Sequence, residues 1–143
     1  MIKPHGADQL KPLFVYDTER HDALLHEAQT LPSIVISSAA AANAVMLGAG
    51  YFTPLAGFMN LADSLSVAAT LRTVDGLFWP VPIVNIVDDI AAIEGAARIA
   101  LRDPNVEGNP ILAIQNVEAI EQFTDDEMTL MTEQVFRTTD EAH

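Results

Sequence analysis

One loop constrains this chain more than any other segment, because residues 48–60 read Gly-Ala-Gly-Tyr-Phe-Thr-Pro-Leu-Ala-Gly-Phe-Met-Asn. Its glycines, Gly48, Gly50 and Gly57, allow backbone angles that other residues resist, and Pro54 fixes one angle between them. Connecting segments usually run over the protein surface, but this one is rich in large apolar side chains. These are Tyr51, Phe52, Leu55, Phe58 and Met59. We therefore expect a shaped loop that buries them.

The composition excludes several classes of protein. The 143 residues include no cysteine, and 20 acidic side chains against 7 basic ones give a net charge of −13. The length suits one domain, and the lack of cysteine excludes disulfides and suits the cytoplasm, where we expect the protein. Its charge repels nucleic acids and anionic membranes, so we expect neither as a partner. The one long apolar stretch, residues 34–51, contains Ser37, Asn43 and Gly48, so we expect no membrane span and no secretory signal.

Capping residues predict three helices in the first half of the chain. Asp17 or Thr18 begins a helix that ends near Gln29, with an apolar stripe of Leu24, Leu25 and Ala28. Ser37 or Ser38 begins a second helix over residues 39–47, which Gly48 ends. Asn60, with Asp63 in a variant capping box, begins a third that runs from Leu61 to about Leu71, with Leu61, Leu65 and Ala68 on one face.

Short strands dominate the middle of the chain. Residues 33–37 read as a strand, and Asp75-Gly76 indicates a hairpin between residues 71–74 and 77–84. Pro80 and Pro82 cannot donate hydrogen bonds, so the second arm is expected to be an edge or bulged strand. Residues 98–102 and 111–115 read as paired strands around a loop rich in turn residues.

A capping box, Thr124-Asp-Asp-Glu127, opens a final helix that carries Met128, Met131, Val135 and Phe136. Helices in the first half followed by short strands, without βαβ alternation, predict an α+β domain with a small, barrel-like sheet. A doubly wound nucleotide-binding fold is not expected.

The histidines form no metal pair. His21 and His26 are five residues apart, whereas helical zinc pairs are four apart, and carboxylates surround them. A solvated helix face is the better interpretation. For His5 a structural role near the start of the chain is favoured over a binding role.

Other candidate groups also have structural explanations. Helix capping accounts for Ser37 and Ser38, which lack the glycines of a nucleophile elbow. Gly48-x-Gly50 follows a helix instead of a strand, unlike a dinucleotide-binding loop. The acidic run Asp125-Asp126-Glu127 opposes a helix dipole, and a hard-metal site is the less favoured interpretation. Arg98 and Arg102 are expected to pair with carboxylates instead of an anionic ligand.

Five segments, in order, resemble the N-terminal region of sulfate adenylyltransferase, also called ATP sulfurylase. The segments are spread over nearly the whole chain: Pro4-His5-Gly6, residues 50–60, residues 72–83, residues 98–101 and Val135-Phe136-Arg137. Residues 38–47 and 103–110 look most like the form found in sulfur-oxidising bacteria.

The resemblance implies a single PUA-like domain over residues 1–143, a small bent β-barrel with packed helices. The parent enzyme is a nucleotidyltransferase that joins sulfate to MgATP to form adenosine 5′-phosphosulfate and pyrophosphate, and it runs backwards in sulfur oxidation. The family places its catalytic residues in a following domain, on Gln-x-Arg-Asn, His-x-x-His and Gly-Arg-Asp motifs. None of these motifs occurs here. Residues 136–143 look like the point where the family continues into that domain.

We therefore assign no catalytic, cofactor-binding or metal residue and no cofactor to this chain, and we expect it to be inactive alone. Its expected role is a scaffold for the catalytic domain or for a homo-oligomer. Two alternatives stay open: a free-standing PUA-like module that binds RNA, which the acidic charge opposes, and an assembly or regulatory protein for a separate sulfurylase subunit.

Overall fold

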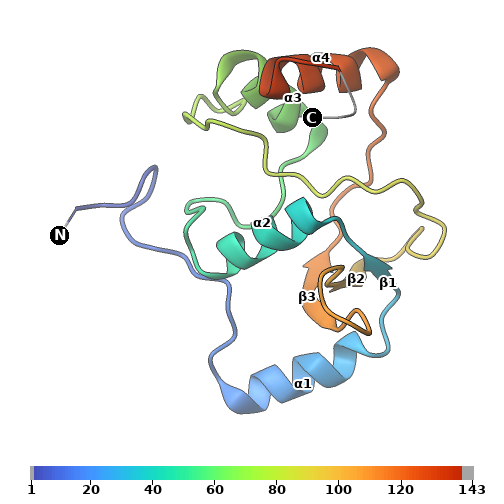
Figure 1. The fold of residues 1–143 in the computed structure, drawn as a ribbon. Coiled ribbons are helices and arrows are strands. Elements are labelled where there is room, and N and C mark those ends of the chain that lie inside the picture. The colour runs from blue at the N-terminus through green and yellow to red at the C-terminus, as the bar shows by residue number, and fades with distance from the viewer. Residues whose placement is uncertain (1, 140–143) are drawn as a thin grey trace. The chain divides into compact units, whose positions relative to one another are not determined.

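A computed structural model describes residues 2–139 and divides them into two compact units. The first unit contains the described residues up to Gly57 together with residues 85–118. The second contains residues 58–84 and the described residues from Ala119 onward. Figure 1 labels the helices and strands of both units.

The first unit is built on a three-stranded sheet with the order β1-β2-β3. Its strands are β1 (Ser33–Val35), β2 (Arg98–Arg102) and β3 (Ile111–Asn116). β2 and β3 are antiparallel, as their hairpin predicts, whereas β1 and β2 are parallel, with Ile34 opposite Leu101. The sequence does not predict this parallel pair, which requires the long crossover through residues 36–97.

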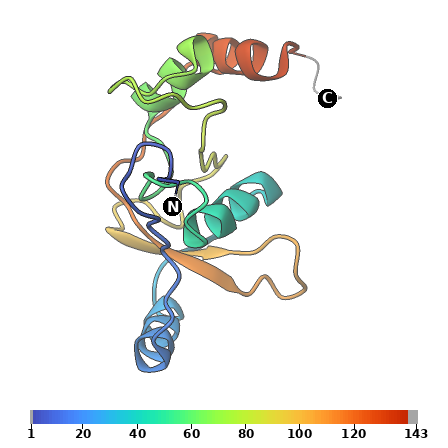
Figure 2. The same ribbon diagram turned by 90° about the vertical axis from the view of Figure 1, so that its left-hand side faces the viewer.

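Two helices flank this sheet on opposite sides, α1 (Thr18–Ala28) and α2 (Ser38–Gly48) (Figure 1, Figure 2). The middle of β2 is consequently buried on both faces, with Ile99, Ala100 and Leu101 at most 2% exposed. Ile36 and Leu47 also belong to this core. The predicted stripe on α1 is only partly right, because Ala28 is buried whereas Leu25 is 41% exposed.

The second unit pairs α3 (Leu61–Thr70) with α4 (Asp125–Phe136). Its core includes Val67, Trp79, Ile83 and Met131. On α3 the buried residues are Ser64, Val67 and Ala68, so the predicted face is confirmed for Ala68, whereas Leu61 and Leu65 are only partly buried. The Ser64 hydroxyl donates to the Asn60 carbonyl oxygen at 2.7 Å, so this buried polar group is satisfied.

The local signals at the helix starts are confirmed. Asp17, Ser37, Asn60 and Thr124 each accept a hydrogen bond from a backbone N–H of the first turn. The variant capping box of α3 is wrong in its second half, because Asp63 Oδ1 instead accepts from the Val74 N–H at 2.8 Å. At the end of α2, Gly48 is still helical and Ala49 is the C-cap.

Three predicted strands are shorter than expected. The Asp75-Gly76 turn is present, but its arms meet in a single bridge between Arg72 and Phe78, and residues 79–84 form no strand. Pro80 and Pro82 lack the N–H groups that would extend this ladder. The predicted strand at residues 33–37 ends at Val35, because the chain turns there to begin α2 at its Ser37 cap. Among the described residues, no helix is both long and apolar enough to cross a bilayer.

Candidate functional site

The N-terminal segment is fastened to the loop that follows α2. The N–H groups of Leu13 and Phe14 both donate to the Gly48 carbonyl oxygen, at 2.8 and 3.0 Å. Further along, the Lys11 N–H donates to Thr53 Oγ1 at 3.0 Å. The Thr53 hydroxyl in turn donates to the Gly50 carbonyl oxygen at 2.6 Å. Thr53 is only 4% exposed, so this hydroxyl is the buried centre of the contact.

The glycines of the loop make this approach possible. A Cβ on Gly48 would lie 2.2 Å from Cε1 of Phe14, and Gly50 adopts a φ of +81° beside the backbone of Pro12. Both glycines are therefore required by packing and backbone geometry, which agrees with rejecting Gly48-x-Gly50 as a nucleotide-binding loop.

The prediction that this loop buries its aromatic residues is wrong for Tyr51. Tyr51 is 71% exposed, and Phe52, Leu55, Phe58 and Met59 are only partly buried. The physical reason is that a buried threonine hydroxyl holds the loop, so its shape does not depend on burying Tyr51.

Residues 10–16, which we call the apolar strap, display large apolar side chains to solvent. Leu10, Leu13, Phe14 and Tyr16 are 61, 45, 47 and 75% exposed. The rings of Phe14 and Tyr16 meet edge to face with centroids 6.3 Å apart. Neither the strap nor the role of Thr53 is predicted from the sequence, and the run Leu-Lys-Pro-Leu-Phe-Val-Tyr at residues 10–16 is the signal that indicates the strap.

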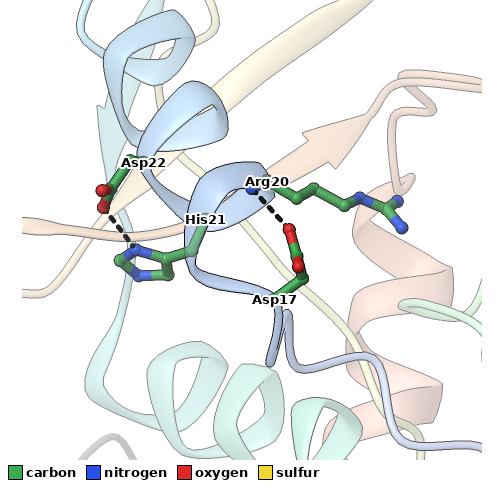
Figure 3. Close-up of polar contacts among 4 residues, drawn as sticks. All are labelled: Asp17, Arg20, His21 and Asp22. Atoms are coloured by element: carbon green, nitrogen blue, oxygen red, sulfur yellow. Dashed lines mark hydrogen bonds and ion pairs between the residues drawn. The ribbon is translucent and has the colours of Figure 1, made fainter.

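The histidines lie where a solvated helix face places them. Figure 3 shows His21 on α1, with Nδ1 3.4 Å from Asp22 Oδ1, next to the Asp17 cap that accepts from the Arg20 N–H. His21 and His26 are exposed, as is His5 in the N-terminal turn. This agrees with the prediction for the helix.

The two serines have different structural roles. Ser37 Oγ accepts from the Ala40 N–H at 3.1 Å and caps α2. Ser38 Oγ donates to Asn105 Oδ1 at 2.7 Å and ties the first turn of α2 to the β2–β3 loop. The prediction of capping is thus confirmed for Ser37 alone.

The two arginines of β2 also differ. Arg98 forms an ion pair with Glu27 of α1, as predicted. The prediction for Arg102 is wrong, because its guanidinium donates to Ser33 Oγ at 2.9 Å and to the Asn109 carbonyl oxygen at 3.1 Å instead of to a carboxylate. The Asn109 φ of +44° turns the loop so that this carbonyl reaches Arg102.

The acidic run at residues 125–127 belongs to the start of α4. Glu127 closes the capping box by accepting from the Thr124 N–H at 2.9 Å, and its own N–H donates to Thr124 Oγ1. Within residues 2–139, no group of three His, Asp or Glu side chains is arranged to hold a metal ion. The serines, the arginines and Glu127 are thus engaged in contacts that stabilise the fold.

The comparisons with known proteins match the chain from end to end. Over 143 residues it is 63% identical to a sulfate adenylyltransferase of Alcanivorax borkumensis and 60% identical to one of Allochromatium vinosum, and it covers 36% of each. The sulfate adenylyltransferase of the Riftia pachyptila sulfur-oxidizing endosymbiont is 53% identical, with 32% of its length covered. The chain thus spans about a third of the length of these curated relatives.

A solved structure supports the fold. The hexameric APS kinase from Thiobacillus denitrificans matches with a TM-score of 0.68 and 34% identity, over 86% of this chain and 24% of that chain. A family model described as a PUA-like domain matches residues 2–143. These matches confirm the predicted α+β, PUA-like fold and the resemblance to sulfate adenylyltransferases. The chain belongs to the PUA-like domain family.

Proposed function

We propose that this chain is the N-terminal, non-catalytic domain of a sulfate adenylyltransferase and acts as a scaffold for the catalytic part of that enzyme. The observation that carries this proposal is the 63% identity over all 143 residues to a protein of which they make up 36%. The parent reaction joins sulfate to ATP, releases pyrophosphate and forms adenosine 5′-phosphosulfate, and in sulfur oxidation it runs in reverse. We place the domain in the cytoplasm with that enzyme.

The contacts of the polar side chains support a structural role. A phosphoryl-transfer site directs cations and N–H donors at the triphosphate. Here the guanidinium groups of Arg98 and Arg102 are directed at Glu27, Ser33 and Asn109 instead. These contacts support assigning MgATP to the rest of the parent enzyme.

Two measurements test the proposal. The isolated chain is incubated with adenosine 5′-phosphosulfate and pyrophosphate, with the full-length Alcanivorax enzyme as the positive control. We expect no ATP above the blank, and ATP formation by the chain would overturn its non-catalytic role. In a chimera, this chain replaces the matched region of the Alcanivorax enzyme, and we expect the chimera to make ATP. A folded but inactive chimera would count against the scaffold role.

The name of the structural neighbour suggests assembly as a second part of the role, because that APS kinase is hexameric. We propose that the domain also contributes to subunit contacts in the assembled enzyme. Light scattering on the active chimera tests this. An oligomer that dissociates when side chains at the subunit contacts are truncated supports the proposal. An active chimera that is monomeric contradicts it. Salt-sensitive binding of RNA by the isolated chain would favour the free-standing module instead.

A further inference from the structure

The apolar strap and Tyr51, which belong to neighbouring segments of the first unit, expose large apolar side chains to solvent. Leu10, Tyr16 and Tyr51 are 61, 75 and 71% exposed. Tyr51 follows Gly50, and a Cβ on Gly50 would lie 3.0 Å from the Pro12 nitrogen, so the loop and the strap are in contact here. Tyrosine and other aromatic residues that are exposed on a free protein often anchor its interfaces with other proteins.

The strap is held in place by its backbone, not by burial of these side chains. Three N–H groups, those of Lys11, Leu13 and Phe14, donate to the segment from Gly48 to Thr53. In both ribbon views the strap runs beside the end of α2 (Figure 1, Figure 2). A surface held in one conformation loses less conformational entropy when a partner covers it.

The charge distribution separates the strap from the rest of the chain. Residues 1–20 contain three acidic and three basic side chains, so the net charge of −13 lies entirely in residues 21–143. Those six are Asp8, Asp17, Glu19, Lys3, Lys11 and Arg20. Within residues 10–16 the only charged side chain is that of Lys11, so a partner that covers the strap takes no carboxylate out of water. The strap is therefore a region of this acidic protein that a protein partner can cover at low electrostatic cost.

We propose that the apolar strap together with Tyr51 is the surface on which the remaining polypeptide of the sulfate adenylyltransferase packs. This inference rests on the proposed function. Nearly two thirds of the Alcanivorax relative lies outside the matched region. That remaining polypeptide is the partner that we propose. Stable interfaces between separate proteins use about 20–30 residues a side, many more than the five exposed side chains here. A partner in the same polypeptide needs fewer contacts, because its effective concentration is high.

Hydroxyl-radical footprinting of the isolated chain and of the chimera tests this surface. We expect Tyr16 and Tyr51 to be labelled about tenfold more slowly in the chimera, because the core of an interface excludes water. Equal labelling in an active chimera would overturn the surface assignment and leave the proposed function standing. If Tyr16 and Tyr51 of the isolated chain are labelled more slowly as the concentration of the chain rises, the surface binds a second copy and the proposal is overturned. An inactive chimera counts against the proposed function, while its labelling pattern still decides the surface.

Matched variants provide a second readout. Tyr16→Ser and Tyr51→Ser in the chimera are expected to restore labelling of Leu10 to its rate in the isolated chain. The controls are Val74→Ser and Ile120→Ser, which change exposed apolar residues of the second unit, 65 and 44% exposed. We expect these controls to leave the labelling of Leu10 unchanged. Circular dichroism of each variant as an isolated chain confirms folding, and an equal effect of the controls would contradict the proposal.

Discussion

The Cβ that Gly50 lacks would lie 3.0 Å from the backbone nitrogen of Pro12. Gly50 also has a φ of +81°, in the region that L side chains rarely adopt. Two separate requirements, a left-handed backbone and a close approach of the strap, thus meet at one residue. The loss of stability due to each requirement can be separated by comparing Gly50 with a glycine that has a left-handed backbone but no close neighbour.

Gly50→Ala is expected to lower the free energy of unfolding by about 2–3 kcal/mol, of which about 1 kcal/mol comes from the left-handed backbone alone. Gly108→Ala is the control, because Gly108 has a φ of +80° and no atom within 4 Å of its missing Cβ. We expect the control to lose only about 1 kcal/mol. Urea denaturation of both variants measures the difference, and equal losses would show that the approach of Pro12 costs nothing.

Thr53→Val is expected to lower the free energy of unfolding by about 1–3 kcal/mol, because it removes the acceptor of the Lys11 N–H and the buried donor to the Gly50 carbonyl oxygen. Thr53→Ser keeps the hydroxyl and should recover most of this loss. The exposed Thr70, whose hydroxyl donates to the Ser66 carbonyl oxygen, provides the matched control Thr70→Val. Thermal unfolding measures all three, and a Thr53→Ser variant no better than Thr53→Val would argue against the hydrogen bond.

Ser37→Ala is expected to lower the free energy of unfolding by about 1 kcal/mol through loss of the α2 cap. Ser38→Ala removes only an exposed hydrogen bond to Asn105 and is expected to cost about 0.5 kcal/mol or less. Amide hydrogen exchange in the first turn of α2 should quicken in Ser37→Ala alone. A larger effect of Ser38→Ala would reverse the assignment of the cap.

The Glu27–Arg98 pair is expected to show a coupling energy of about 0.5–1 kcal/mol in a double-mutant cycle of Glu27→Gln and Arg98→Met. Both side chains are more than a third exposed, so solvent screening limits this value. Their coupling should fall at about 1 M salt, where the Debye length is near 3 Å.

The control for this ion pair is Lys3–Asp8, whose side chains are 74 and 88% exposed. We expect the cycle of Lys3→Met and Asp8→Asn to give no measurable coupling. Coupling at Glu27–Arg98 that persists in high salt would indicate that packing of the Arg98 side chain, and not charge, holds α1 to the sheet.

The features predicted correctly from the sequence depend on neighbouring residues. A cap such as Asp17 or Thr124 bonds to an N–H three residues away, so the pattern contains both partners. The same holds for the turn at Asp75-Gly76, where the Gly76 N–H donates to the Thr73 carbonyl oxygen. The resemblance to sulfate adenylyltransferases also came from short ordered segments, and the comparisons confirm it.

The errors involve partners distant in the sequence. Asp63 reaches Val74 in place of its own helix cap, and Arg102 reaches Ser33, which is 69 residues away. The apolar composition of the loop predicts that Tyr51 is buried, but burial depends on which segment lies against it. The sequence does not predict the candidate surface for the same reason.

The starts of the helices, the α+β class and the family can all be predicted from the sequence, because capping, turns and motif order are local properties. The role of the loop at residues 48–60 becomes clear only in the folded chain. There the buried Thr53 hydroxyl and the close approach of Pro12 to Gly50 hold the strap, and the aromatic side chains of Tyr16 and Tyr51 face solvent. Exposure results from contacts between distant segments, and no pattern within the loop specifies them.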